Sequence, residues 1–167
     1  QYANKENDAK ALEVIKSLGI NPTAVELPQS LPIGSLLIML SAEAAASFDE
    51  LTRTNQDDSL ANQRRNAWPN LFRAARFIPA VEYINASRVR WELIQALNET
   101  FKNYDVIICP SFGGSQLLVT NLTGNPCAVV PNGFNKDGSP TSISFIGKLY
   151  GDANVARLAH AYQEATD

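Results

Sequence analysis

Residues 121–147 read NLTGNPCAVVPNGFNKDGSPTSISFIG, and this stretch decides the fold. Two apolar runs, residues 128–130 and 142–146, have the length and composition of buried strands. The segment from Asn135 to Ser139 contains Asp-Gly and predicts a hairpin between them. No activated nucleophile can be named, because no serine of the chain lies in a GxSxG or SxxK pattern.

Outside this stretch, apolar spacing predicts helices over residues 7–18, 36–53, 68–77, 79–103 and 152–165. Strands are predicted over residues 23–27 and 106–109. This order of elements indicates an α/β protein, and the length of 167 residues favours a single unit over 1–167. Only about four strands are available for these helices, so part of a larger sheet is expected to be missing. The fourth helix is expected to bury one stripe, made of Val81, Ile84, Trp91, Ile94, Leu97 and Phe101.

Charge and hydropathy exclude two classes of partner. The chain is 45% hydrophobic with a formal net charge of -3, so it lacks the clustered basic surface that nucleic acid requires. Its richest apolar run, residues 36–40, is far shorter than the ~20 residues that span a membrane. A cytoplasmic location is favoured, and periplasmic or secreted locations are left open.

The titratable residues do not predict a catalytic or metal centre. His160, the single histidine, is interpreted as structural, and no HxxxH or CxxC spacing supports a metal. Cys109 and Cys127 lie in apolar surroundings and are expected to be buried, inert thiols. Glu43 falls in an apolar helix segment, where a partner such as Arg88 or Arg90 would make an internal strut.

The Gly113-Gly114 pair follows the strand at residues 106–109. It resembles a phosphate loop, but no GK[ST] follows and we expect no helix directly behind it. A glycine-rich loop at the carboxyl end of a strand is nevertheless where open α/β sheets bind ligands. From its residues alone, the sequence predicts a ligand-lining part of an α/β enzyme.

Several motifs, taken together in order, resemble a known family. They are YINASRVR at 83–90, FKNYDVIICP at 101–110, NLTGNP at 121–126, VPNGF at 130–134, DGSP at 137–140, IG at 146–147 and AYQEAT at 161–166. Their order and spacing are similar to the C-terminal part of amidase-signature enzymes. The implied fold is the C-terminal portion of the amidase-signature fold, a mixed β-sheet covered by helices.

The resemblance implies hydrolysis of C–N amide bonds by a serine, a second serine joined by a cis peptide, and a lysine. Those three residues belong to an N-terminal half with a Gly/Ser-rich signature, and this sequence has no GGSSGG-like segment. The chain is therefore expected to hold no catalytic residue, to need no cofactor or metal, and to be inactive alone. Its expected partners are the N-terminal half of the same amidase and a small-molecule amide substrate, with possible self-association through exposed apolar surface.

In the complete enzyme, the loop 111–116 and the turn 120–123 are expected to line the substrate pocket. The candidate substrate-binding residues are Ser111, Phe112, Asn121 and Thr123. Phe112 supplies a large apolar side chain and Asn121 a polar contact, although Asn121 bracing the turn and Phe112 packing in the core remain alternatives. A binding or interaction module that keeps the fold without the chemistry is the rival function, and a non-catalytic subunit completed by a partner is a third.

Overall fold

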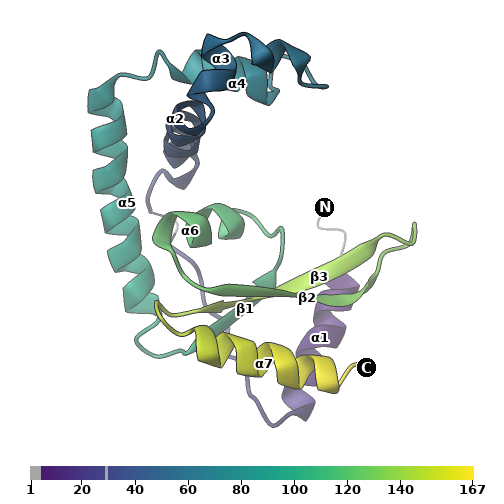
Figure 1. Cartoon of the computed structure of the whole chain (residues 1–167). Coiled ribbons are helices and arrows are strands. Elements are labelled where there is room, and N and C mark those ends of the chain that lie inside the picture. Colours follow the sequence, from purple (N-terminus) through teal and green to yellow (C-terminus); the bar gives the residue numbers. More distant parts are fainter. Residues whose placement is uncertain (1–4, 29) are drawn as a thin grey trace. The chain divides into compact units, whose positions relative to one another are not determined.

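The computed structural model describes residues 5–28 and 30–167, which form two compact units (Figure 1). The first unit joins Gln1–Gln29 to Leu93–Asp167, and the second is Ser30–Glu92. The first unit contains α1 (Lys5–Ser17), β1 (Val106–Pro110), α6 (Gln116–Thr123), β2 (Cys127–Phe134), β3 (Pro140–Gly147) and α7 (Asp152–Glu164). The second contains η1 (Ile33–Leu36), α2 (Leu37–Ser47), α3 (Asp49–Arg53), η2 (Gln56–Ser59) and α4 (Trp68–Ala75). Helix α5 (Ala80–Thr100) runs from the second unit into the first.

In the described residues, three strands form one antiparallel sheet in the order β1-β3-β2. The last strand in sequence is therefore the central one, with Ile108 and Ala128 both opposite Phe145. The tight turn that joins β2 to β3 is closed by the Asn135 N–H, which donates to the Ser139 carbonyl at 2.9 Å. The α/β class and the predicted hairpin are confirmed.

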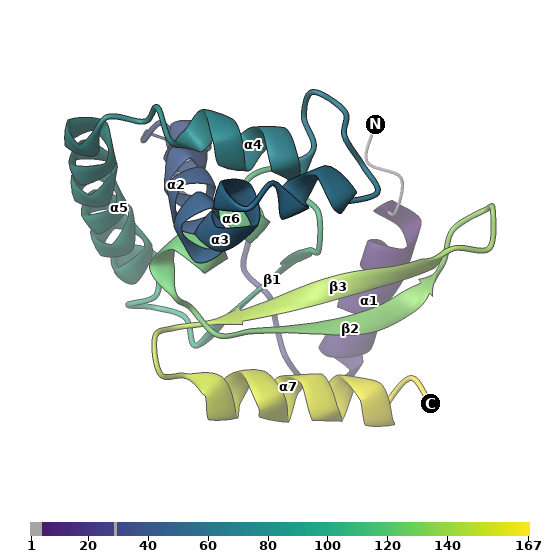
Figure 2. The same cartoon turned by 45° about the horizontal axis from the view of Figure 1, so that its top comes forward.

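Helices α1 and α7 cover one face of this sheet and bury the core of the first unit (Figure 2). Phe145 is fully buried and packs edge-on against the Tyr162 ring, with 5.7 Å between ring centroids. Helix α6 lies on the opposite side of the sheet from α7 in both views. The core cluster consists of Ala11, Ile15, Val130, Ile143, Phe145, Val155, Ala159 and Tyr162.

The second unit has a smaller core in which Phe72 of α4 packs with Ala45 and Ala75. The Phe72 ring also stacks with those of Phe48 and Trp68, at centroid distances of 5.2 and 5.6 Å. None of the helices in the described part of the chain combines the length and apolarity that crossing a bilayer requires.

Three predictions about the N-terminal elements were wrong. Residues 23–27 form no strand. They alternate between apolar and polar side chains but pair with no other strand, and only Val25 and Leu27 are partly buried. The helix predicted over 36–53 is broken at Phe48, whose φ of -107° and ψ of 25° separate α2 from α3. Glu43 is exposed rather than enclosed, and it accepts a hydrogen bond from the Tyr83 hydroxyl at 2.8 Å.

The buried stripe predicted for α5 is correct only near the end of the helix. Leu97, and Phe101 just beyond the helix, are buried, whereas Val81, Ile84 and Trp91 are each more than half exposed. A helix buries one continuous apolar stripe only when it packs on the same core along its whole length. Helix α5 passes from one compact unit to the other, so its two ends have different neighbours.

Candidate functional site

Ser111 directly follows β1 and holds the end of that strand to β3. Its side chain is buried, and its Oγ accepts hydrogen bonds from the hydroxyls of Ser142 at 2.9 Å and Ser144 at 3.0 Å. The Ser111 hydroxyl is therefore the shared partner of two side chains on β3.

The loop after Ser111 is a tight turn that leads straight into a helix. The Gly113 N–H donates to the Pro110 carbonyl at 3.2 Å, and a Cβ on Gly113 would lie only 3.1 Å from the Pro110 ring. Gly114 has a φ of +61°, in the left-handed region that favours glycine. Phe112 is 79% exposed between these constrained residues, so it does not pack in a core.

Helix α6 begins at Gln116, so the prediction that no helix opens behind the two glycines was wrong. Val119, Thr120 and Thr123 are β-branched, which lowers the helix propensity of this short segment and hid it from sequence reasoning. The signal that was missed is the spacing of positions 116, 119–120 and 123. These positions share one helix face, and the structure buries all of them. Gly124, with a φ of 76°, ends the helix.

The predicted turn at 120–123 is therefore the last part of α6, and its polar side chains bond to their own helix. Asn121 is exposed and donates its Nδ2 to the Leu117 carbonyl at 2.8 Å. Thr123 is buried and donates its hydroxyl to the Val119 carbonyl at 2.9 Å. Asn121 is therefore accessible at the surface, whereas Thr123 is buried with its hydroxyl bonded to its own helix.

The structure thus brings Ser111 and Phe112 together on one loop and places Asn121 and Thr123 on the helix that follows it. Gln116 was not among the residues predicted from the sequence. Its side chain is 2% exposed, and its Oε1 has no hydrogen-bond partner within the described part of the chain. A buried amide oxygen without a donor is costly, and this one lies at the first residue of α6.

Comparisons with known proteins support one family. No family model matches the sequence. The chain is 28% identical to a glutamyl-tRNA(Gln) amidotransferase subunit from Bacillus licheniformis, over 98% of this chain and 41% of the relative. Its fold matches a bacterial aryl acylamidase of the amidase-signature family with a TM-score of 0.79, at 18% identity, over 99% of this chain and 40% of that one. These similarities support an amidase-signature C-terminal fragment. The S177A allophanate hydrolase of Kluyveromyces lactis is similar too, with a TM-score of 0.74 at 20% identity over 97% of this chain and 29% of that protein.

The chain spans about two fifths of the length of the amidotransferase relatives that it matches, and it corresponds to their C-terminal part. The solved structures, all at low identity, establish the fold. Both the recognition of the family from its motifs and the predicted fold class are confirmed.

The two thiols of the chain, Cys109 and Cys127, are free. Burial raises the pKa of Cys109 to about 12, with smaller contributions from Cys127 and Asp8. Burial also raises the pKa of Cys127, although a hydrogen bond with Ser144 acts in the opposite direction and lowers this pKa. Cys127 is exposed, contrary to the prediction of two buried thiols, because it begins a strand at the edge of the described sheet.

Among the described residues, the remaining titratable side chains form no metal-binding cluster. His160 is exposed and lies 3.3 Å from Glu164 on the next turn of α7. No group of three or more potential metal ligands occurs among the described residues.

Proposed function

We propose that this chain is the C-terminal part of an amidase that hydrolyses C–N bonds in small-molecule amides. In this proposal the chain supplies strands of the sheet and one wall of the substrate pocket. The N-terminal half of the same protein supplies the nucleophilic serine, the bridging serine and the lysine. The similarity to amidase-signature proteins and the coverage of about two fifths of each relative support this division of labour.

The observation that carries the proposal is the loop from Ser111 to Gln116. Ser111 is fixed by two hydroxyls of β3, and Gly113 packs tightly on Pro110, so the base of the loop is rigid. Phe112 is largely exposed on that base and offers a flat apolar surface. A rigid loop that presents one large side chain at a strand end is suited to holding part of a substrate.

The reaction implied for the complete protein is acyl transfer through a serine ester. The serine oxygen bonds to the amide carbonyl carbon, the C–N bond breaks, and the serine proton reaches the leaving nitrogen through the second serine and the lysine. Water then cleaves the ester, releases the acid and restores the serine. Backbone amides stabilise the oxyanion in both steps. Phe112 and Asn121 would hold the part of the substrate that does not react, and so set specificity rather than perform chemistry.

The substrate we propose is an amide other than glutamine. Residues 113–116 read GGSQ and hold no carboxylate that could pair with an amino group of the substrate. The named amidotransferase relatives therefore indicate ancestry rather than the substrate of this protein.

The test uses the full protein that contains this chain and the 167-residue chain alone. The full protein should hydrolyse aryl or aliphatic amides, and the chain alone should not. Mixing the chain with a separately produced N-terminal half should restore activity if the two parts build one site. A full protein that binds amides without hydrolysing them would favour the rival function, a binding module that retains the fold.

A further inference from the structure

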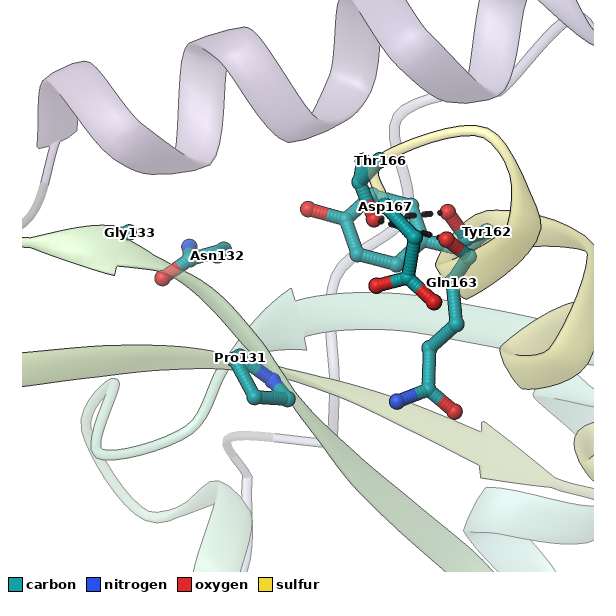
Figure 3. A pocket seen from close by; sticks show the side chains of 7 residues that line it. All are labelled: Pro131, Asn132, Gly133, Tyr162, Gln163, Thr166 and Asp167. Carbon is teal, nitrogen blue, oxygen red and sulfur yellow. Dashed lines mark hydrogen bonds between the residues drawn. The ribbon is translucent and has the colours of Figure 1, made fainter.

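A second candidate site lies on the other side of the sheet, between β2 and the C-terminal end of α7 (Figure 3). It is an open hollow of about 290 Å³, lined by residues 131–133 and by Tyr162, Gln163, Thr166 and Asp167. The pairing of β2 with β3 shifts between Pro131 and Gly133, so Asn132 is the extra residue of a β-bulge. Asn132 lines the hollow at this bulge.

Tyr162 supplies a hydroxyl that lacks a partner, on a side chain that is otherwise enclosed. The residue is 2% exposed, and its ring packs on Phe145. Figure 3 shows the hydroxyl pointing across the hollow toward Asn132. The described residues offer it no hydrogen bond, although the hydroxyls of buried tyrosines usually find one.

Asp8 of α1 places a negative charge behind the wall of the hollow. It is 9% exposed, and its Oδ1 accepts a hydrogen bond from Asn132 Nδ2 at 2.7 Å. Its Oδ2 is buried and has no partner in the described part of the chain. The Asn132 oxygen is already used, because it accepts from the Thr141 hydroxyl at 2.7 Å. The charge of Asp8 also contributes, after burial, to raising the pKa of Tyr162, so these two side chains are close in space.

The other charges near the hollow do not neutralise Asp8. Asp167 adds a second carboxylate at its rim, and the C-terminal end of α7 adds partial negative charge. Lys10, on the same helix as Asp8, pairs with Glu6 at 3.1 Å, and the partner of His160 is Glu164. In the described residues no basic side chain forms an ion pair with Asp8. A ligand that completes the site must therefore bring positive charge and N–H donors.

We propose that this hollow binds a primary ammonium group, carried by a small alkylamine or by a lysine side chain. The ammonium donates a hydrogen bond to Tyr162 Oη and is balanced by the carboxylate of Asp8. An ammonium is compact and has three donors, which suits polar groups that lie next to the apolar surfaces of Pro131 and the Tyr162 ring. The site uses no residue of the loop after β1, so it does not depend on the proposed amidase function.

The experiment measures binding of n-butylammonium to the full protein by saturation-transfer NMR, with 1-butanol as the neutral probe. Saturable binding of the amine, about tenfold or more tighter than that of the alcohol, is expected. Tyr162→Phe keeps the ring and Asp8→Asn keeps the shape, and each should weaken amine binding about fivefold or more. Tyr150→Phe, at a tyrosine that is 96% exposed, and Asp152→Asn, in the first turn of α7, are matched controls that should change nothing.

A second probe, Nα-acetyl-lysine N-methylamide, distinguishes a lysine side chain from a free amine as the carrier of the ammonium group. Tighter binding of this probe than of butylammonium assigns the site to a lysine side chain, and the reverse assigns it to a free amine. Equal binding of amine and alcohol, or amine binding that Tyr162→Phe leaves unchanged in a protein of unaltered melting temperature, would overturn the proposal. Tighter binding of n-propylguanidinium than of either amine would overturn it as well.

Discussion

The Ser144 hydroxyl on the central strand donates to the Ser111 hydroxyl at 3.0 Å, although 33 positions separate the two residues. Both side chains are buried, and Ser142 donates to the same oxygen. The start of the candidate substrate loop is thus fixed to β3 by hydroxyls rather than by apolar packing.

Replacing Ser111 with Ala removes the acceptor shared by two serines. We expect a loss of about 1–3 kcal/mol in the free energy of unfolding, because buried donors lose their partner. Denaturant unfolding of the full protein checks this. Ser115→Ala is the control, since Ser115 is exposed and makes no capping hydrogen bond, and it should change stability by less than about 0.5 kcal/mol. Equal effects of the two changes would contradict the role of Ser111.

Phe112→Ala in the full protein should reorder a series of amide substrates by kcat/KM while catalysis survives at a lower rate. The melting temperature should hardly move, because the ring is 79% exposed. Phe134→Ala is the matched control, because Phe134 is 70% exposed at the end of β2. An unchanged substrate order together with a lower melting temperature would make Phe112 a packing residue.

The 167-residue chain alone should self-associate, because Val129 and Phe77 are 58% and 86% exposed and a partner would normally cover such side chains. Sedimentation at increasing concentration and binding of a hydrophobic dye measure this. Phe77→Ser should reduce dye binding more than Tyr150→Ser, since phenylalanine is the more apolar of these two exposed rings. A strict monomer that binds no dye would refute the prediction.

The two thiols should react at different rates. At about pH 8 iodoacetamide should modify Cys127 first, because it is exposed, whereas the raised pKa of about 12 keeps Cys109 in the thiol form. Mass spectrometry of a time course reports the order of modification, and Cys127→Ser should leave only the slow reaction.

The raised pKa of Cys109 also makes stability depend on pH. Raising the pH above about 9 ionises Cys109 in the unfolded chain before it does so in the folded one. The Cys109 contribution to stability therefore falls between about pH 9 and pH 12.

In the second unit, Arg73→Met should be strongly destabilising. Arg73 Nη2 lies 2.7 Å from Oδ2 of Asp57, which is 1% exposed and has no other partner for that oxygen in the described residues. Removing the cation leaves a buried carboxylate unpaired, at a cost of about 3–5 kcal/mol. Arg53→Met is the control, since Arg53 forms an exposed pair with Asp49 and should cost less than about 1 kcal/mol. Thermal unfolding compares the two variants.

Sequence periodicity predicted the three strands of the described sheet and most of the helices, but it missed α6 and added a strand at 23–27. Strands β2 and β3 have a hairpin signal between two apolar runs, so local chemistry determined both. The segment at 23–27 alternates in the same way but pairs with no strand, because pairing depends on a partner that local sequence does not reveal. At the candidate site, the sequence located the loop, but the hydroxyl contacts of Ser111 depend on a register between distant strands.

The polar contacts of α1 have a consequence for the order of events during synthesis. Asn7 donates to the Phe134 carbonyl and to the Thr141 hydroxyl, so this helix finds its place only after 127 to 134 further residues have been made. At about 5–20 residues per second, that takes roughly 6–27 s on the ribosome. Throughout that interval Ala11 and Ile15 have no sheet to cover, and the whole of residues 30–92 emerges first. The apolar residues of the nascent helix therefore stay uncovered until the final hairpin emerges.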